Sequence, residues 1–200
     1  MAKKDSMLDV FERNKYDLGT VVKKSRGWFE QQVQLLNKQQ LTPNKVLNGN
    51  TEQLVTKVYP GKLYMYVYDP KLKAELPYYD RFPLVFPFKS TPDGFIGLNM
   101  HYLPYQLRIS LLDNLLVFRT NRRMDETTRL KYSWQVIDGV SRFKAAQPCV
   151  KQYLTGHIRS QFRQIVAEDW ATAMLLPVER FIGANKQEVW ADSRKIIRKV

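Results

Sequence analysis

The sequence predicts an α+β fold in which a small antiparallel sheet in the middle of the chain packs against several helices. Residues 62–102 are rich in aromatic and β-favouring residues and are divided by Pro, Gly and Asp turns. Apolar residues on both sides of this segment recur at helical spacing. With 200 residues and 44% hydrophobic content, the chain can bury a sizeable core. We expect a helical arm over 1–45 and one α+β domain over 46–200.

The first predicted elements are two helices, over 6–18 and 20–39, which are placed by the spacing of their apolar residues. Residues 41–53 contain Pro43, Asn48 and Gly49, which favour turns, and this segment is the best candidate for a linker.

The first predicted strand spans 62–68, and its side chains should alternate between two faces. One face would carry Tyr64, Tyr66 and Tyr68, and the other would be aliphatic. These rings could stack on unpaired bases, because lysines flank them. Alternatively, they could pack beneath a helix or against a neighbouring subunit.

Two further strands should follow. Residues 82–88 include Pro83 and Pro87, which lack the amide hydrogen that a ladder needs, so we expect this segment at a sheet edge or as an irregular strand. Residues 95–102 form the third predicted strand, after a turn over 91–94 that has the expected Pro and Gly.

The second half of the chain returns to helical spacing. A helix should begin at Pro104, and another should begin near Asp125 and end by Gly139. The remaining predictions are a helix over 149–160, a short strand over 162–166, and helices over 169–176 and 186–199.

The residue types exclude several kinds of chemistry. Two histidines and one cysteine cannot form a four-ligand Cys/His zinc site, and we expect His101 and His157 to be structural. No nucleophile-elbow or phosphate-loop motif occurs, so we expect no catalytic residue, no cofactor and no small-molecule substrate. A metal-dependent nuclease stays open as an alternative, provided that acidic residues converge near the sheet, namely Asp69, Glu75, Asp80 and Asp93.

The chain also lacks the features of export and membrane insertion. Cys149 has no partner for an internal disulfide, and no signal peptide opens the sequence. Apolar runs are far shorter than a membrane span, so we expect no membrane partner and a cytosolic site of synthesis.

The charge balance favours a polyanionic partner. Lys and Arg number 32 against 19 Asp and Glu, for a net charge of +13. A solvated basic surface that serves solubility is the alternative. Arginine-rich clusters suit phosphate because guanidinium groups bind it bidentately. The candidate contacts with nucleic acid are Lys23, Lys24, Arg26, Arg119, Arg122, Arg123, Arg129, Lys131, Arg159 and Arg163.

Three segments carry a family resemblance: PGKLYMYVYDPKLKAELPYYDRFPLVFPF (60–88), GFIGLNMHYLP (94–104) and VERFIGANKQEVWADSRKII (178–197). They resemble the DNA end protector proteins of T-even-type tailed phages and their marine relatives. The resemblance implies a minor virion protein near the head and neck that binds the ends of packaged double-stranded DNA and shields them from host exonuclease. It implies residence in the host cytoplasm during assembly and then in the virion.

A tail, baseplate or neck subunit of the same kind of phage is the other interpretation. Such a subunit would act through contacts with other virion proteins and would not need DNA. Both interpretations fit a chain without catalytic motifs.

Overall fold

The computed structural model describes residues 53–105, 107–109, 111–112, 115, 123–175 and 177–198. The helices predicted over 6–18 and 20–39 lie outside these residues. Most of the predicted linker and the boundary between 1–45 and 46–200 lie outside them as well.

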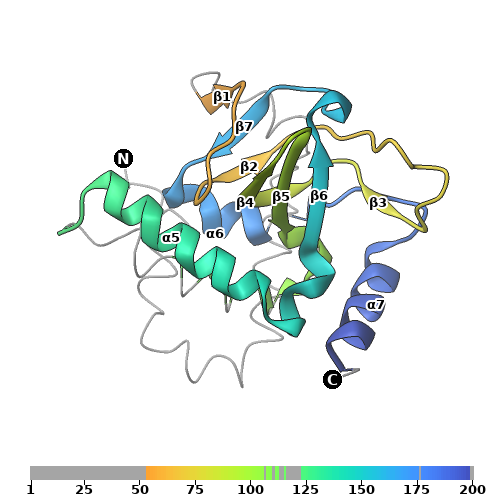
Figure 1. Ribbon diagram of the computed structural model, residues 1–200. Coiled ribbons are helices and arrows are strands. Elements are labelled where there is room, and N and C mark those ends of the chain that lie inside the picture. Colours follow the sequence, from red (N-terminus) through yellow and green to blue (C-terminus); the bar gives the residue numbers. More distant parts are fainter. Residues whose placement is uncertain are drawn as a thin grey trace, which may run out of the picture.

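A six-stranded antiparallel sheet forms the centre of the described fold (Figure 1). Its strand order is β1-β7-β2-β4-β5-β6, and a second sheet pairs β3 with β8. The predicted α+β class is therefore confirmed. The bounds are β1 Leu54–Val55, β2 Leu63–Met65, β3 Tyr79–Asp80, β4 Leu84–Thr91, β5 Gly94–Asn99, β6 Val150–Leu154, β7 Phe162–Ile165 and β8 Phe181–Ile182.

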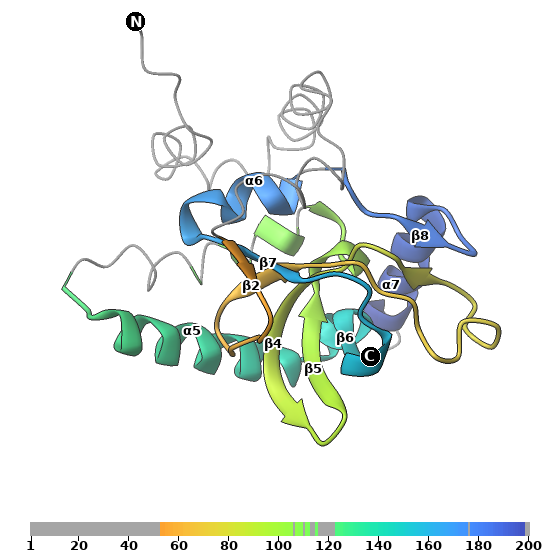
Figure 2. The ribbon, with the colours of Figure 1, turned by 90° about the horizontal axis from the view of Figure 1, so that it is seen from above.

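Three helices pack around the strands, as Figure 2 shows: α5 Glu126–Ser141, α6 Trp170–Leu175 and α7 Lys186–Arg198. Ile137, Met174 and Val189 bring them into one aliphatic cluster with the sheet. The predicted start of α5 is confirmed, because the Asp125 carboxylate caps it by accepting a hydrogen bond from the Thr128 amide at 2.8 Å. The described residues between 105 and 115 are also helical.

The predicted alternation of the first strand is confirmed. Leu63 and Met65 belong to the aliphatic cluster on one side of the sheet. Tyr64 and Tyr66 belong to a second, mainly aromatic cluster on the other side, with Phe162. The strand is shorter than predicted, although an isolated bridge from Tyr68 to Ile158 extends the pairing.

Of the two alternatives for residues 82–88, the sheet edge is wrong, because β4 lies between β2 and β5. The irregular strand is confirmed, because the pairing with β5 shifts register between Pro87 and Lys89. The pairing of β4 with β2 covers only Leu84 and Val85. Pro87 lies beyond that pairing, at a register shift opposite β5, so its missing amide hydrogen interrupts no ladder bond to β2.

The helix predicted over 149–160 is also wrong, because β6 and a 3-10 turn, η4 Thr155–His157, occupy this segment. β6 pairs with β5 from Gly94 to Leu98. The backbones of β5 and β6 approach closely there, since a Cβ on Gly94 would lie 1.9 Å from the Tyr153 carbonyl oxygen. Pairing with a glycine-containing neighbour therefore overrides the local helical preference. The other predicted elements of this region are confirmed as β7, α6 and α7.

Candidate nucleic-acid interface

The amino end of α5 carries three of the predicted contacts. Arg123 and Lys131 are exposed. Arg129 is half-buried, and its guanidinium lies 3.5 Å from the Glu126 carboxylate. Arg129 and Lys131 are two positions apart on a helix, so they point in different directions. This end of α5 is a basic surface, and the Arg129 guanidinium within it pairs with Glu126.

The pair Arg159 and Arg163 is separated by the structure. Arg159 is exposed, and it lies 4.0 Å from Asp69, which also accepts a hydrogen bond from Lys73 at 3.0 Å. That bond and the neighbouring cations hold the pKa of Asp69 below its usual value. Arg163 is only 2% exposed, within β7, and donates to the Gln53 amide oxygen. Arg163 is therefore part of the sheet and not of the basic surface.

The remaining predicted contacts, Lys23, Lys24, Arg26, Arg119 and Arg122, lie outside the described residues. Of the others, the structure brings together Arg123, Arg129 and Lys131 near the amino end of α5. Arg159 follows η4, at the far end of β6 (Figure 1).

The tyrosines of the first strand do not form an exposed stacking surface. Tyr64 and Tyr66 are fully buried and Tyr68 is 7% exposed. The ring of Tyr66 lies 5.0 Å from that of Phe162 and 5.5 Å from that of Tyr153, both edge-on. This is the geometry of an aromatic core. The rings are therefore packed and not exposed, but in the described part of the chain their partners come from other strands and loops and not from a helix.

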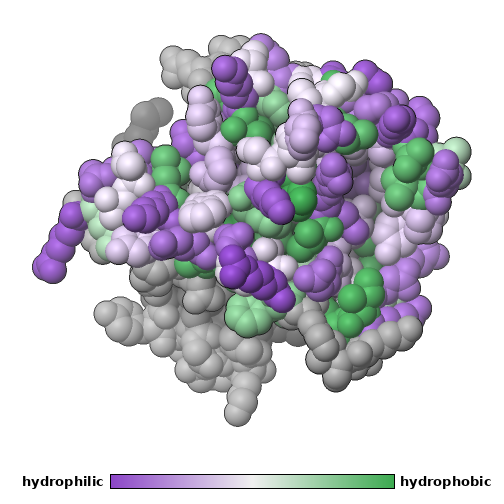
Figure 3. Space-filling model, in the orientation of Figure 1, coloured by the Kyte–Doolittle hydropathy of each residue, from purple (hydrophilic) through white to green (hydrophobic). Residues whose placement is uncertain are grey.

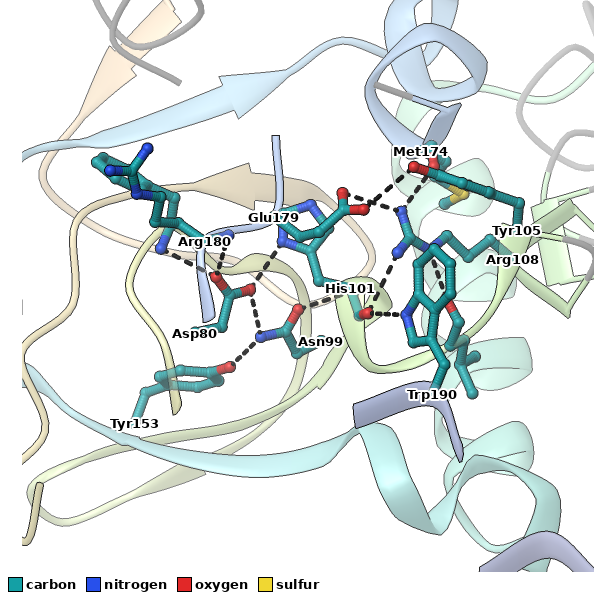
Figure 4. Close-up of polar contacts among 12 residues, drawn as sticks. Asp80, Asn99, His101, Tyr105, Arg108, Tyr153, Met174, Glu179, Arg180 and Trp190 are labelled. Atoms are coloured by element: carbon teal, nitrogen blue, oxygen red, sulfur yellow. Dashed lines mark hydrogen bonds and ion pairs between the residues drawn. The ribbon is translucent and has the colours of Figure 1, made fainter. Parts of the chain in front are cut away.

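A buried polar network joins β3 to the central sheet (Figure 4). One oxygen of Asp80 lies 2.7 Å from His101 Nδ1 and accepts a hydrogen bond from the Asn99 amide at 3.1 Å. Its other oxygen accepts from the Phe82 amide at 3.1 Å. The same Asn99 amide donates to the Tyr153 hydroxyl at 3.0 Å. The network fixes the position of the β3 segment against β5 and β6.

A second buried group surrounds Arg108 (Figure 4). Its guanidinium donates to the carbonyl oxygens of Leu103, His101 and Met174, at 2.7, 3.2 and 3.0 Å. It lies 4.0 Å from Glu179, whose side chain is 2% exposed. Burial opposes ionisation of Glu179, but the neighbouring cations together hold its pKa below the usual value. This arginine stabilises the fold and is not available to a ligand.

The acidic residues considered for a nuclease do not converge. Asp69 is paired with lysine and arginine, and Asp80 accepts hydrogen bonds within the core. Glu75 and Asp93 are exposed. Across the described ranges, no group of three or more His, Cys, Asp or Glu side chains could hold a metal ion. Within these ranges, no helix is long and apolar enough to cross a bilayer.

Sequence reasoning missed the buried group, although a signal for Arg108 exists. Leu112 and Leu115 follow Arg108 at four and seven positions, so all three share one helical stripe. A cation on an apolar stripe indicates a buried arginine with internal acceptors. No comparable local pattern identifies Asn99 or Glu179.

The comparison with protein families covers nearly the whole chain. The family described as phage T4 terminal DNA protecting protein matches residues 9–199. The chain belongs to this family. The resemblance of the three quoted segments to DNA end protectors is therefore confirmed. No curated protein and no solved structure matches the chain significantly. The description of the terminal DNA protecting protein family supports DNA end protection as its general role.

Proposed function

We propose that this protein binds the ends of packaged double-stranded DNA and shields them from exonuclease, as a virion component near the head-tail neck. The observation that carries the proposal is the family match over residues 9–199, because the family is described by the protection of terminal DNA. Under this proposal the protein resides in the host cytoplasm during assembly and then in the virion.

The charge distribution supports contact with the phosphate backbone. The net charge is +13. Among the described residues, several exposed cations have no carboxylate within ion-pair distance, namely Lys57, Lys71, Arg81, Lys89, Lys131, Arg180 and Arg194. Cations without an internal partner can exchange condensed counterions for phosphate contacts.

The proposed contacts are Arg123, Arg129, Lys131 and Arg159, with five residues outside the described part: Lys23, Lys24, Arg26, Arg119 and Arg122. We leave out Arg163, because its burial in β7 removes it from the surface. Protection in this proposal is passive and not enzymatic: the protein occupies the end, so that an exonuclease cannot reach it.

A test measures both binding and protection. Linear duplex DNA is incubated with the protein and then with an exonuclease, at salt concentrations from about 50 to 300 mM. We expect protection that weakens steeply with salt. Replacing Arg119, Arg122 and Arg123 with Ala should weaken binding. The slope of the logarithm of the binding constant against the logarithm of salt concentration should become less negative by about 0.9 for each phosphate that is no longer neutralised.

The nuclease alternative is tested in the same reactions. Linear DNA with Mg²⁺ and without exonuclease should stay intact. Cleavage that EDTA abolishes would replace protection with a nuclease assignment. A binding curve that does not change with salt would instead contradict the proposed contact with DNA phosphates.

A structural role in the tail, baseplate or neck is the second candidate, and one observation favours it. Large hydrophobic side chains are exposed along and just after α5: Tyr132 at 39%, Trp134 at 37% and Phe143 at 66%. Exposed aromatic residues are common at protein interfaces. A protein that leaves linear DNA unprotected, yet occupies a fixed place in the particle, would favour this role.

A further inference from the structure

A pocket of about 380 Å³ lies between β6 and the segment from Tyr68 to Asp80. Figure 3 shows hydrophobic side chains among hydrophilic ones on the face over β6 and β3. Pockets for small organic ligands have volumes of about 300 to 1,000 Å³, so this one has room for a single nucleotide and not for a duplex. Five tyrosines and two lysines contribute to its lining: Tyr68, Tyr78, Tyr79, Tyr102, Tyr153, Lys71 and Lys151.

The aromatic part of the lining is held in place by the core. The Tyr153 hydroxyl accepts a hydrogen bond from Asn99 at 3.0 Å, and its ring lies 5.0 Å from that of Tyr68. The ring of Tyr102 lies 5.1 Å from that of Phe181. Because these rings are already ordered in the free protein, less side-chain conformational entropy is lost when a ligand binds.

The two lysines give the pocket a positive charge. Lys151 is half-buried, with Nζ 4.2 Å from the centre of the Tyr102 ring, and Lys71 is exposed. In the described part of the chain, neither has a carboxylate within ion-pair distance. Burial lowers the pKa of Lys151, and an anion beside it would favour the charged form. Asp80 also lines the pocket, but its oxygens already accept hydrogen bonds inside the protein.

We propose that this pocket binds the terminal nucleotide of a DNA strand, with the base against the tyrosines and the phosphate beside Lys71 and Lys151. The inference rests on the proposed function, since it names the part of the DNA end that is held. Aromatic rings stack on any base, and a lysine binds phosphate as a point charge. The lysines favour a nucleotide over the apolar side chain of a protein partner.

This arrangement distinguishes an end from the interior of a duplex. A base inside the duplex must be unpaired and unstacked before it can enter a pocket of this size. The terminal base has one stacking neighbour fewer, so it opens more readily. The pocket would therefore favour an end of any sequence, while the basic surfaces hold the adjoining backbone.

The test uses a short duplex with 2-aminopurine as its terminal base, compared with the same duplex closed by a hairpin loop at each end. We expect the wild-type protein to quench the terminal fluorophore and to bind the open duplex about tenfold more tightly than the closed one. Tyr79→Leu and Lys151→Met should abolish the quenching and the preference but keep the binding of closed DNA. Tyr79 lies outside both core clusters, so its replacement removes no core packing.

Matched variants separate the pocket from general effects. Tyr79→Phe keeps the ring and should keep the quenching. Lys195→Met replaces an exposed lysine of α7 that pairs with Asp192 and lies outside the pocket, and it should leave the preference unchanged. Lys71→Met changes an exposed side chain, so folding is unaffected, and it too should reduce the preference for the open end.

Each outcome decides between the two proposals. Folded pocket variants that keep both the quenching and the preference overturn the pocket proposal, leave DNA protection standing and make a hydrophobic peptide the better occupant. Equal binding of open and closed DNA by the wild type overturns it in the same way. A wild-type protein that binds neither duplex overturns the proposed function and, with it, the pocket.

Discussion

The two faces of the central sheet are both buried, but they are built from different chemistry. One face packs aliphatic residues against the helices and encloses the charged pair of Arg108 and Glu179. The other packs tyrosines and phenylalanines edge-on, with Tyr66 at its centre. The first face therefore depends on a carboxylate that stays ionised, and the second on phenols that stay neutral.

The comparison also shows that burial decides what a cation does in a protein of net charge +13. Arg108 is fully buried and satisfies three carbonyl oxygens. Lys131 is exposed on α5. The first kind of cation stabilises the fold, and the second kind is exposed, as the proposed DNA contact requires.

The largest expected effect comes from removing the charge of Arg108 on the helical face, by which we mean the sheet face that packs against the helices. Arg108→Leu removes a buried charge that lies 4.0 Å from Glu179 and the hydrogen bonds to the carbonyl oxygens of Leu103, His101 and Met174, so we expect the free energy of unfolding to fall by about 3–5 kcal/mol. Urea unfolding at neutral pH measures the change. Arg142→Leu is the control, because this arginine pairs with Asp138 at the surface and should cost less than about 1 kcal/mol. A similar small loss for Arg108→Leu would show that the buried pair is dispensable.

High pH should weaken the aromatic face. Burial raises the pKa of Tyr64 from 10 to about 12, so the unfolded chain loses this proton first and the stabilisation disappears as pH rises. We expect Tyr64 to account for a loss of about 1 kcal/mol between pH 8 and 11. Tyr64→Phe should show a flatter decline, at a cost of about 1 kcal/mol at neutral pH from the absent bond to the Tyr59 amide. Parallel curves for both proteins would contradict the assignment.

Low pH should weaken the helical face. The pKa of Glu179 lies below its ordinary value of 4.5 in the folded state, so the unfolded chain takes up the proton first. Its contribution is complete above the ordinary value and is lost as pH falls through the lower folded value. The decline should be shallow, since burial opposes the effect of the cations. Glu179→Gln should remove this component, which thermal unfolding from about pH 7 to 3 would detect.

The smallest effect on stability should come from the exposed cations. Replacing Lys131 with Ala should change the free energy of unfolding by less than about 0.5 kcal/mol, because this side chain is exposed. The same variant should bind DNA more weakly, with a salt slope reduced by about 0.9 for each phosphate that is no longer neutralised. Chemical unfolding and DNA titration on one preparation separate the two roles. A destabilised variant with unaltered DNA binding would reverse the distinction between buried and exposed cations.

Local patterns predict the faces of β2, the cap of α5 and the last helix correctly, because each depends on neighbours in the sequence. They fail where a distant segment decides. Within 149–160, residues Val150–Leu154 form β6 because β5 offers glycines to pair with. Similarly, β4 is interior although it contains Pro87. Both outcomes depend on pairing between distant segments, which the spacing of residues within one segment does not predict.

The candidate site shows the same division. Charge clustering identifies the basic end of α5, but it cannot tell that Arg163 lies inside the sheet. The sequence does not predict the pocket, because its tyrosines and Lys151 come from segments far apart in the chain. Tyr68 belongs to the regularly spaced tyrosines of the first strand, whereas the other tyrosines at the pocket come from distant segments of the chain.

The strand order has a consequence for how the protein is made. β7, which comes late in the chain, lies between β1 and β2, which come early. The sheet therefore cannot close until residue 165 has left the ribosome, and folding must wait for pairing between segments of long sequence separation. A fragment from a premature stop before β7 would expose the unpaired edges of β1 and β2 and would be prone to aggregate.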